Sequence, residues 1–264
     1  MNSFWYNLTS FSAFRKRILP HLSANYFHEF GHSMPLGNGY WANLLENDAY
    51  DSFSEIFIQQ EYADYLPKEP ISRILDIGAH YGYFSLWLQS QHPEIEIHSL
   101  MIEPSLRCQK SLNKLINHPK LNGRFTYLQK LIDAPEKGTS FFYDRPHMAS
   151  SRFILDEEEQ PIKARTLQEK DVMESLHPPY DLVKVDIEGS EWHFLNNFEE
   201  TLYHTKFLVL EWHSWHEGGG DVEQIRKRLS SLGFHIENES SPVPATGRDG
   251  EVGLISATRR NEAG

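Results

Sequence analysis

The sequence predicts an α/β fold in which helices cover both faces of a mostly parallel sheet. A short apolar strand at residues 74–77 runs into a glycine turn and then into a helix. Further apolar runs that end in polar residues alternate with helix-like segments along the chain, until a pair of strands near 233–237 and 253–258 closes the series. Alternation of this kind is typical of parallel sheets whose crossover connections are helices.

The first strand and the turn after it are the most informative stretch. Apart from Asp76, residues 74–77 are apolar with β-branched character, as expected for a strand buried on both faces. Gly78 and Gly82 bracket a tight turn, and residues 83–90 carry apolar side chains with helical spacing. A strand, a glycine turn and a helix in this order bring backbone N–H groups and a helix N-terminus to one point, where they can bind a ligand.

Two ligands commonly use such a turn, a dinucleotide or S-adenosylmethionine. A dinucleotide needs three glycines so that its pyrophosphate can approach the backbone, but the middle position here is His80. S-adenosylmethionine has no phosphate, and Asp76 suits the ammonium of its amino-acid end. The spacing therefore favours S-adenosylmethionine, with these candidate cofactor contacts: Asp76, Gly78, His80, Tyr81 and Gly82.

Acidic residues end the next two predicted strands. The second strand, 96–104, includes Glu103, whose carboxylate can accept both hydroxyls of a ribose, as nucleoside-binding α/β folds require. A helix is expected at 106–117, and a third strand at 125–132 runs into Asp133. That aspartate either faces the adenine amino group or caps a turn. Glu103 and Asp133 are therefore further candidate cofactor contacts.

Charged residues alternate with apolar ones in the predicted fourth strand, within residues 180–191. Lys184, Asp186 and Glu188 occupy every second position. Charges in a buried strand are costly unless they are paired, and ligands bind at the carboxyl ends of parallel strands. We therefore interpret these three as site residues, with Asp186 also a candidate cofactor contact. Glu191 suits the positive end of the helix that follows.

Shorter elements complete the predicted domain. A fifth strand is expected at 206–213, and a helix at 221–232 has Asp221 as its N-cap. The remaining expected elements are short strands at 138–143, 152–155 and 162–166 and a helix at 167–176.

Residues 1–66 differ from the rest in their dense aromatics and interrupting glycines. Short helices expected at 3–19 and 51–65 form an N-terminal helical cap on the sheet, or a lid over a substrate. The aromatic residues also offer a surface through which two copies can form a homo-oligomer. We expect two units, this cap and a cofactor-binding domain at 67–264. As a lid, the cap supplies substrate contacts from a glycine-rich loop: Tyr40, Trp41 and Asn43.

Composition excludes several classes of function. The formal net charge of −12 argues against nucleic acid as a partner, because such affinity comes mostly from clustered Lys and Arg. No run approaches the ~20 apolar residues that span a bilayer, so we expect no membrane partner. The single cysteine, Cys108, cannot form an intramolecular disulfide, which favours a cytoplasmic location.

Three motifs in the same order resemble the FkbM-type S-adenosylmethionine-dependent methyltransferases. They are the Asp-Ile-Gly-Ala-His-Tyr-Gly turn at 76–82, Glu-Pro at 103–104, and Lys-Val-Asp-Ile-Glu-Gly-Ser-Glu at 184–191. The last block is the most specific, and the resemblance covers roughly residues 50 to 240. Two positions depart from the family pattern, His80 where Asn is usual and Gln168 where Asp is common.

The resemblance implies a class I methyltransferase fold, Rossmann-like, with a seven-stranded and mostly parallel sheet whose last strand is antiparallel. It implies S-adenosylmethionine as cofactor and O-methylation of a hydroxyl on a small molecule, such as a secondary metabolite in natural product biosynthesis or a sugar. Two other classes stay open. One is a nicotinamide-dependent oxidoreductase, and the other is a non-catalytic module that keeps the cofactor pocket.

The candidate catalytic residues come from adjacent strand ends. Methyl transfer needs an acceptor oxygen held in line with the methyl group and a group that takes its proton. With an ordinary pKa of about 6.5, His213 is the best base, and Asp186 or Glu211 would orient it, beside Lys184. The same Asp, Glu and His are also a ligand set for a divalent metal. A purely structural cluster is the third interpretation.

Overall fold

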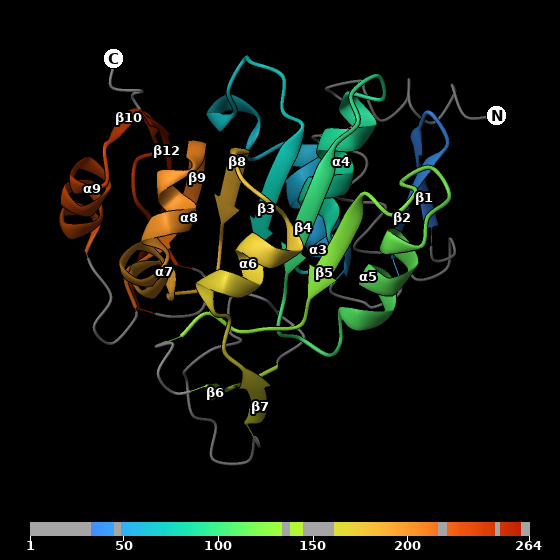
Figure 1. The fold of residues 1–264 in the computed structure, drawn as a ribbon. Helices are drawn as coiled ribbons and strands as arrows, with labels where there is room; N and C mark the ends of the chain where they lie inside the picture. The colour runs from blue at the N-terminus through green and yellow to red at the C-terminus, as the bar shows by residue number, and fades with distance from the viewer. Residues whose placement is uncertain are drawn as a thin grey trace.

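The computed structural model describes residues 33–44, 49–133, 138–144, 161–215, 221–245 and 249–259. Its centre is one sheet flanked by helices (Figure 1). The strands run in the spatial order β10, β12, β9, β8, β3, β4, β5, and a short β11 pairs with β12. Their bounds are β3 Arg73–Ile77, β4 His98–Ile102, β5 Phe125–Leu128, β8 Tyr180–Val185, β9 Thr205–His213, β10 Phe234–Glu239, β11 Val243–Pro244 and β12 Glu251–Arg259.

The strand directions confirm the predicted sheet. Strands β5, β4, β3, β8 and β9 are parallel neighbours, and β12 inserts antiparallel between β9 and β10. The chain moves outward from β3 to β5 and then returns to the other side of β3 with β8. Such a reversal leaves a crevice beyond the carboxyl ends of the two central strands, where ligands bind in open α/β sheets.

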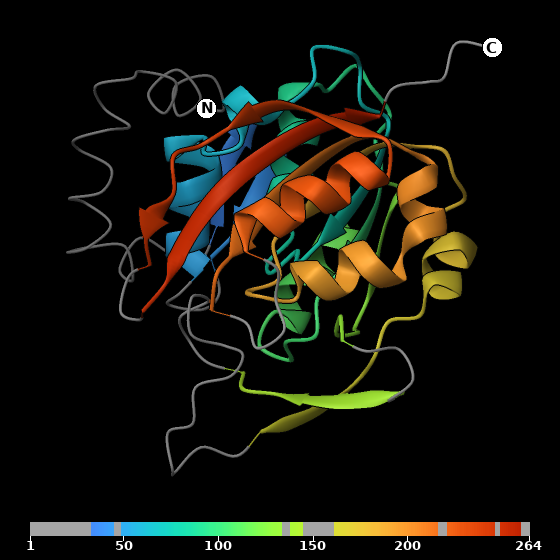
Figure 2. The same ribbon diagram turned by 90° about the vertical axis from the view of Figure 1, so that its left-hand side faces the viewer.

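Two apolar clusters fill the two faces of the sheet. On β9, Phe207 and Val209 belong to one cluster, and Leu208 and Leu210 belong to the other, as the two-residue period of a strand requires. Figure 2 shows the orange helices of the C-terminal half on one face and the blue and green elements behind the sheet. Helices α4 Tyr83–Gln91 and α5 Gln109–Ile116 pack on the first face; α6 Glu169–Ser175, α7 Glu191–Asn197, α8 Glu199–Tyr203 and α9 Val222–Ser231 pack on the second.

The sequence-based boundaries are close to those of the structure. Strand β8 ends at Val185, so the charged block extends past the strand into the following loop. Asp221 caps α9 as predicted, since its carboxylate accepts a hydrogen bond from the backbone N–H of Gln224 at 2.8 Å. A separate antiparallel pair is formed by β6 Thr139–Phe142 and β7 Ile162–Arg165. The strand expected at 152–155 lies outside the described residues.

The N-terminal part differs from the all-helical cap that the sequence suggests. Strands β1 Ser33–Gly37 and β2 Tyr40–Asn43 form a hairpin where a glycine-rich loop is expected. The turn residues Asn38 and Gly39 have φ values of 50° and 77°, the left-handed pair that an Asn-Gly hairpin turn uses. The helix expected at 51–65 is broken into α3 Ala49–Phe53, the π-helix η3 Ser54–Gln59 and the 3₁₀ turn η4 Ala63–Tyr65. The helix expected at 3–19 lies outside the described residues.

Across the described ranges, none of the helices combines the length and the apolar character needed to cross a bilayer.

Glycine is required in the first turn because of a backbone contact. Gly78 has φ of 75°, and a Cβ placed there would lie 1.6 Å from the carbonyl oxygen of Asp186. At Gly82 a Cβ would lie 2.5 Å from a side-chain carbon of Leu115 on the neighbouring helix α5. The first glycine thus lets the end of β8 approach the turn, and the second lets α5 pack on it.

Replacing Gly78 by alanine is expected to destabilise the protein more than the same change at Gly123. Gly123 has a similar φ of 74°, but no atom of the described residues lies within 4 Å of the added Cβ. Gly123→Ala should therefore lower the free energy of unfolding by about 1–2 kcal/mol, the cost of a left-handed alanine. Gly78→Ala should lower the free energy of unfolding by roughly a further 1–3 kcal/mol, because its added Cβ clashes with the backbone of Asp186. Urea unfolding of both variants measures the difference, and equal losses would contradict the proposed contact.

Candidate active site

A cavity of about 230 Å³ opens at the carboxyl ends of β3, β8 and β9. The strand period places the charged residues in and beside this cavity on one face of the sheet. Asp76 on β3 is directly paired with Lys184 on β8. On β9, Glu211 and His213 follow Val209 at two-residue steps and therefore point to the same face of the sheet as Val209. That face is the one on which the N-terminal elements pack. Residues that follow β8 complete the wall, together with a segment from η3 to η4.

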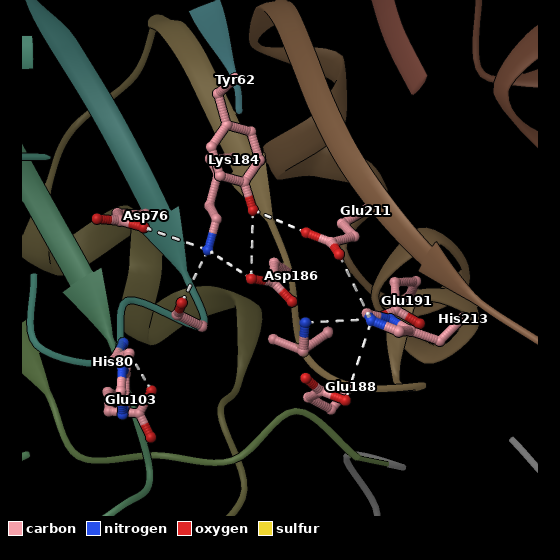
Figure 3. A network of polar contacts seen from close by, with 12 residues as sticks. Tyr62, Asp76, His80, Glu103, Lys184, Asp186, Glu188, Glu191, Glu211 and His213 are labelled. Carbon is pink, nitrogen blue, oxygen red and sulfur yellow. Dashed lines mark hydrogen bonds and ion pairs between the residues drawn. The ribbon is translucent and has the colours of Figure 1, made fainter. Parts of the chain in front are cut away.

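Lys184 links the turn to the end of β8 (Figure 3). Its Nζ donates to the carbonyl oxygen of Gly78 at 2.9 Å and to Oδ2 of Asp186 at 3.2 Å, and lies 3.9 Å from Oδ1 of Asp76. Burial alone would lower the pKa of this lysine, but Asp186 and Asp76 raise it above its ordinary value. The ammonium therefore stays charged and holds two carboxylates and a turn carbonyl in fixed positions.

Asp76 lies beneath the turn rather than in the cavity wall. Its Oδ2 accepts a hydrogen bond from the hydroxyl of Ser85 at 2.6 Å. Burial raises the pKa of Asp76, although Lys184 and Ser85 act in the opposite direction. Within the described part of the chain, Oδ1 has no hydrogen-bond donor. The residue thus anchors Lys184 and helix α4, and its predicted contact with the cofactor has only this free oxygen to use.

His213 is oriented by Glu191, a partner that the sequence did not suggest. The Nδ1 atom of His213 lies 3.0 Å from Oε1 of Glu191, which also accepts from the backbone N–H of Ile187 and Gly189. On the other side of the ring, Nε2 lies 3.9 Å from Oε2 of Glu188 and 4.0 Å from Oε1 of Glu211.

This environment changes the charge of His213. Burial alone would lower its pKa, but the carboxylates led by Glu191 raise the pKa of His213 to about 10. The ring is then protonated at neutral pH, a departure from the ordinary pKa on which the prediction of a general base rests.

Tyr62 contacts the carboxylates of both Asp186 and Glu211. Its hydroxyl is 2.8 Å from Oε2 of Glu211 and 3.3 Å from Oδ2 of Asp186. Burial and the neighbouring Asp186 raise the pKa of Glu211 well above its usual range. Burial opposes ionisation of Asp186, but Lys184 and His213 hold the pKa of Asp186 below its ordinary value. Asp186 is thus a carboxylate that ionises readily, and its neighbour Glu211 is one that resists ionisation.

The turn and the end of β4 are joined by Glu103. Its Oε2 accepts from the backbone N–H of His80 at 2.8 Å, and its Oε1 accepts from that of Ser105 at 2.9 Å. Burial raises the pKa of Glu103 to about 7 despite these donors. Burial also lowers the pKa of His80 to about 3, so its ring is neutral. His80 has φ of 48°, a conformation that Asn adopts more readily than most residues, which explains the usual family residue there.

The other predicted cofactor residues lie around this core. The ring of Tyr81 packs on that of His80 with centroids 3.9 Å apart. Asp133 accepts a hydrogen bond from the hydroxyl of Ser140 and lies 3.9 Å from Nε2 of His193. Of the predicted cofactor contacts, three line the cavity: Gly78, His80 and Asp186.

The three predicted substrate residues lie outside the cavity wall. Tyr40 is buried and its ring stacks on His118, Trp41 is 42% exposed, and the carbonyl of Asn43 accepts a hydrogen bond from Tyr83. The N-terminal part reaches the cavity through a later segment instead, with Ser52, Glu55, Ile56, Glu61 and Tyr62. The sequence offered one signal for this segment, because the resemblance to the FkbM family begins at about residue 50.

Comparison with known proteins identifies the class. A family model described as Methyltransferase FkbM domain matches residues 76–236. The methyltransferase sdnD of Sordaria araneosa is 26% identical over 223 residues, which are 71% of this chain and 82% of that protein.

Two solved structures show weaker similarity. The methyltransferase FkbM from Methylobacillus flagellatus KT is 16% identical with a TM-score of 0.49, and the match covers 81% of this chain and 51% of that one. Precorrin-6y C5,15-methyltransferase from Geobacter metallireducens GS-15 is 12% identical with a TM-score of 0.42, and the match covers 77% and 87% of the two chains.

The class of protein is therefore a methyltransferase. Because the family model spans more than half of its residues, the chain belongs to the FkbM methyltransferase family, which confirms the resemblance read from the three motifs. Membership of this family implies S-adenosylmethionine as the methyl donor.

Removing the charge of Lys184 is expected to destabilise the fold. Lys184→Met leaves Asp76 and Asp186 without their buried cation and should lower the free energy of unfolding by about 3–5 kcal/mol. Lys206→Met is a matched control, because that lysine pairs with Asp181 at 2.6 Å but is 64% exposed. The control should lose less than about 1 kcal/mol. Urea unfolding compares them, and similar losses would contradict a structural role for the buried ammonium.

Proposed function

We propose that the protein transfers the methyl group of S-adenosylmethionine to a hydroxyl oxygen of a small molecule. The observation that carries the proposal is the meeting of Asp186, Glu211 and His213 in one cavity with the glycine turn at Gly78. Family membership implies the donor, and the cavity wall offers groups that can hold a hydroxyl and take its proton.

The residues of the turn fit the implied cofactor. Glu103 presents a buried carboxylate at the end of β4, where ribose hydroxyls can donate to it. His80 is buried, and its Nδ1 has no hydrogen-bond partner among the described residues, so a polar group of a bound cofactor would satisfy it. When bound, S-adenosylmethionine supplies a methyl carbon on a positively charged sulfur, which makes the methyl group an electrophile.

Proton removal favours a hydroxyl over an amine as the acceptor. As the acceptor oxygen forms its bond to the methyl carbon, the methyl–sulfur bond breaks and its electron pair stays on sulfur. The hydroxyl proton must leave to the protein, whereas a neutral amine attacks with its own lone pair. Asp186 stays ionised in the cavity wall and can accept this proton, and the protonated ring of His213 beside it can hold the acceptor oxygen as a hydrogen-bond donor.

A product screen tests this function. The protein is incubated with methyl-labelled S-adenosylmethionine and a panel of hydroxyl, amine and carboxyl compounds, and labelled products are identified by mass spectrometry. Label on a hydroxyl oxygen is the expected result, and label only on nitrogen or carboxyl groups would overturn it. Thermal-shift titration gives a parallel measurement, in which S-adenosylhomocysteine should stabilise the protein and NAD or NADP should not.

Cofactor binding is expected to weaken as pH falls from 8 to 6. The pKa of Glu103 is about 7, so its carboxylate is protonated below that pH and then accepts hydrogen bonds from the cofactor less strongly. The dissociation constant of S-adenosylhomocysteine should rise about tenfold across this range. Glu103→Gln should weaken binding by roughly 1–3 kcal/mol and flatten the pH dependence. Calorimetry at three pH values measures the loss of affinity and its pH dependence. If the pH dependence in Glu103→Gln equalled that of the wild type, Glu103 would be excluded as a cofactor contact.

The segment from Ser52 to Tyr62 forms the acceptor side of the site in this proposal. Glu55 lines the cavity with an exposed side chain, so Glu55→Trp adds bulk there without burying a new group. The variant should raise the KM of the acceptor several-fold and leave the affinity for S-adenosylhomocysteine unchanged. Trp41→Ala, outside the cavity wall, is the control. If only the control raised KM, the substrate contact predicted from the sequence would replace the one proposed here.

A further inference from the structure

We propose that Asp186, Glu211 and His213 bind a divalent metal ion in the acceptor cavity. One potential ligand atom from each residue lies within 4.8 Å of those of the other two. Glu211 and His213 lie on β9, and Asp186 directly follows β8, the parallel neighbour whose register with β9 the sheet fixes. Two carboxylates and one imidazole nitrogen are a ligand set that suits Mg²⁺, Mn²⁺, Fe²⁺ or Zn²⁺.

The histidine is arranged as a metal ligand. Metal-binding histidines usually donate the other ring N–H to a carboxylate, which fixes the orientation of the ring. Here Nδ1 of His213 contacts Glu191 at 3.0 Å, and two backbone N–H groups hold that glutamate. Nε2 of this buried ring makes no hydrogen bond within the described ranges and faces the carboxylates in the cavity (Figure 3).

The carboxylates are held from behind in the same way. Lys184 and Tyr62 both contact Oδ2 of Asp186, and Tyr62 also contacts Oε2 of Glu211. No donor in the described part of the chain hydrogen-bonds the opposite oxygens, and Oε1 of Glu211 lies 4.0 Å from Nε2 of His213. Each candidate ligand thus has one atom fixed by the protein and another directed toward the common centre.

The local charge also favours a cation. Oε2 of Glu188 lies 3.9 Å from Nε2 of His213. Four carboxylates therefore surround this one imidazole, those of Asp186, Glu188, Glu191 and Glu211. Lys184 contacts this group only from the side of Asp186. Partly buried carboxylates that repel one another are stabilised by a bound cation at their centre.

The catalytic role of the ion rests on the proposed function. A divalent ion at this position would bind the oxygen of the acceptor hydroxyl and lower its pKa. The hydroxyl proton could then leave to solvent or a neighbouring carboxylate, and the oxygen would attack the methyl carbon as in the metal-free scheme.

Mn²⁺ titration of the full chain, followed by the electron paramagnetic resonance of the free ion, tests the site. We expect one ion per chain, with affinity reduced at least tenfold in Asp186→Asn and His213→Ala. His204→Ala is the matched control, because its imidazole contacts the carboxylate of Glu200 at 3.2 Å but belongs to no cluster of three ligands among the described residues. The control should bind as the wild type does. Binding that is absent, or equally strong in all four proteins, would overturn the site.

Two further measurements separate the site from the function. The circular dichroism spectrum of each variant, which does not depend on cofactor binding, shows that a lost metal site is not a lost fold. Methyl transfer that stops with chelator and returns with Mn²⁺ supports the catalytic role, and chelator-insensitive transfer overturns that role. If Mn²⁺ binds as expected but no hydroxyl is methylated, the proposed function fails and the metal site stands.

Discussion

The buried ammonium of Lys184 is the interaction on which the rest of the site depends. It is the point where the carbonyl of the first turn, the aspartate beneath that turn and the carboxylate after β8 meet. A lysine in this position is stable only because the neighbouring strands bring carboxylates to it in register. The spacing of the sheet therefore sets the geometry of the turn and of the acidic wall at the same time.

Much of the fold could be predicted from the sequence because its signals are local. A strand, a glycine turn and a helix appear within about twenty residues, and the alternation of Lys184, Asp186 and Glu188 marks a strand end. The hairpin of the N-terminal part also had a local signal, Asn38-Gly39, which is a strong hairpin turn that the sequence-based interpretation treated as part of a loop.

The site could be predicted only in part because its contacts join distant segments. Tyr62 reaches Asp186 and Glu211 across 124 and 149 positions, and no spacing rule connects them. The pairing of His213 with Glu191 is similar, since the glutamate had a sufficient local explanation at the start of α7. Burial then decides the protonation of each group, and the ordinary pKa of histidine, from which the role of general base was predicted, does not apply inside four carboxylates.

The backbone contact at Gly78 divides the cavity into a side where substitution is restricted and a side where side chains can change. One side of the cavity is built from a turn and a strand end so close together that no side chain fits between them. The opposite side is built from side chains of residues 52–62, which precede the sheet and meet the acidic wall through Tyr62. Substitutions in that segment can reshape the cavity while the turn stays constant. A single scaffold of this kind can therefore acquire new acceptors by changing a short stretch of sequence that lies outside the sheet.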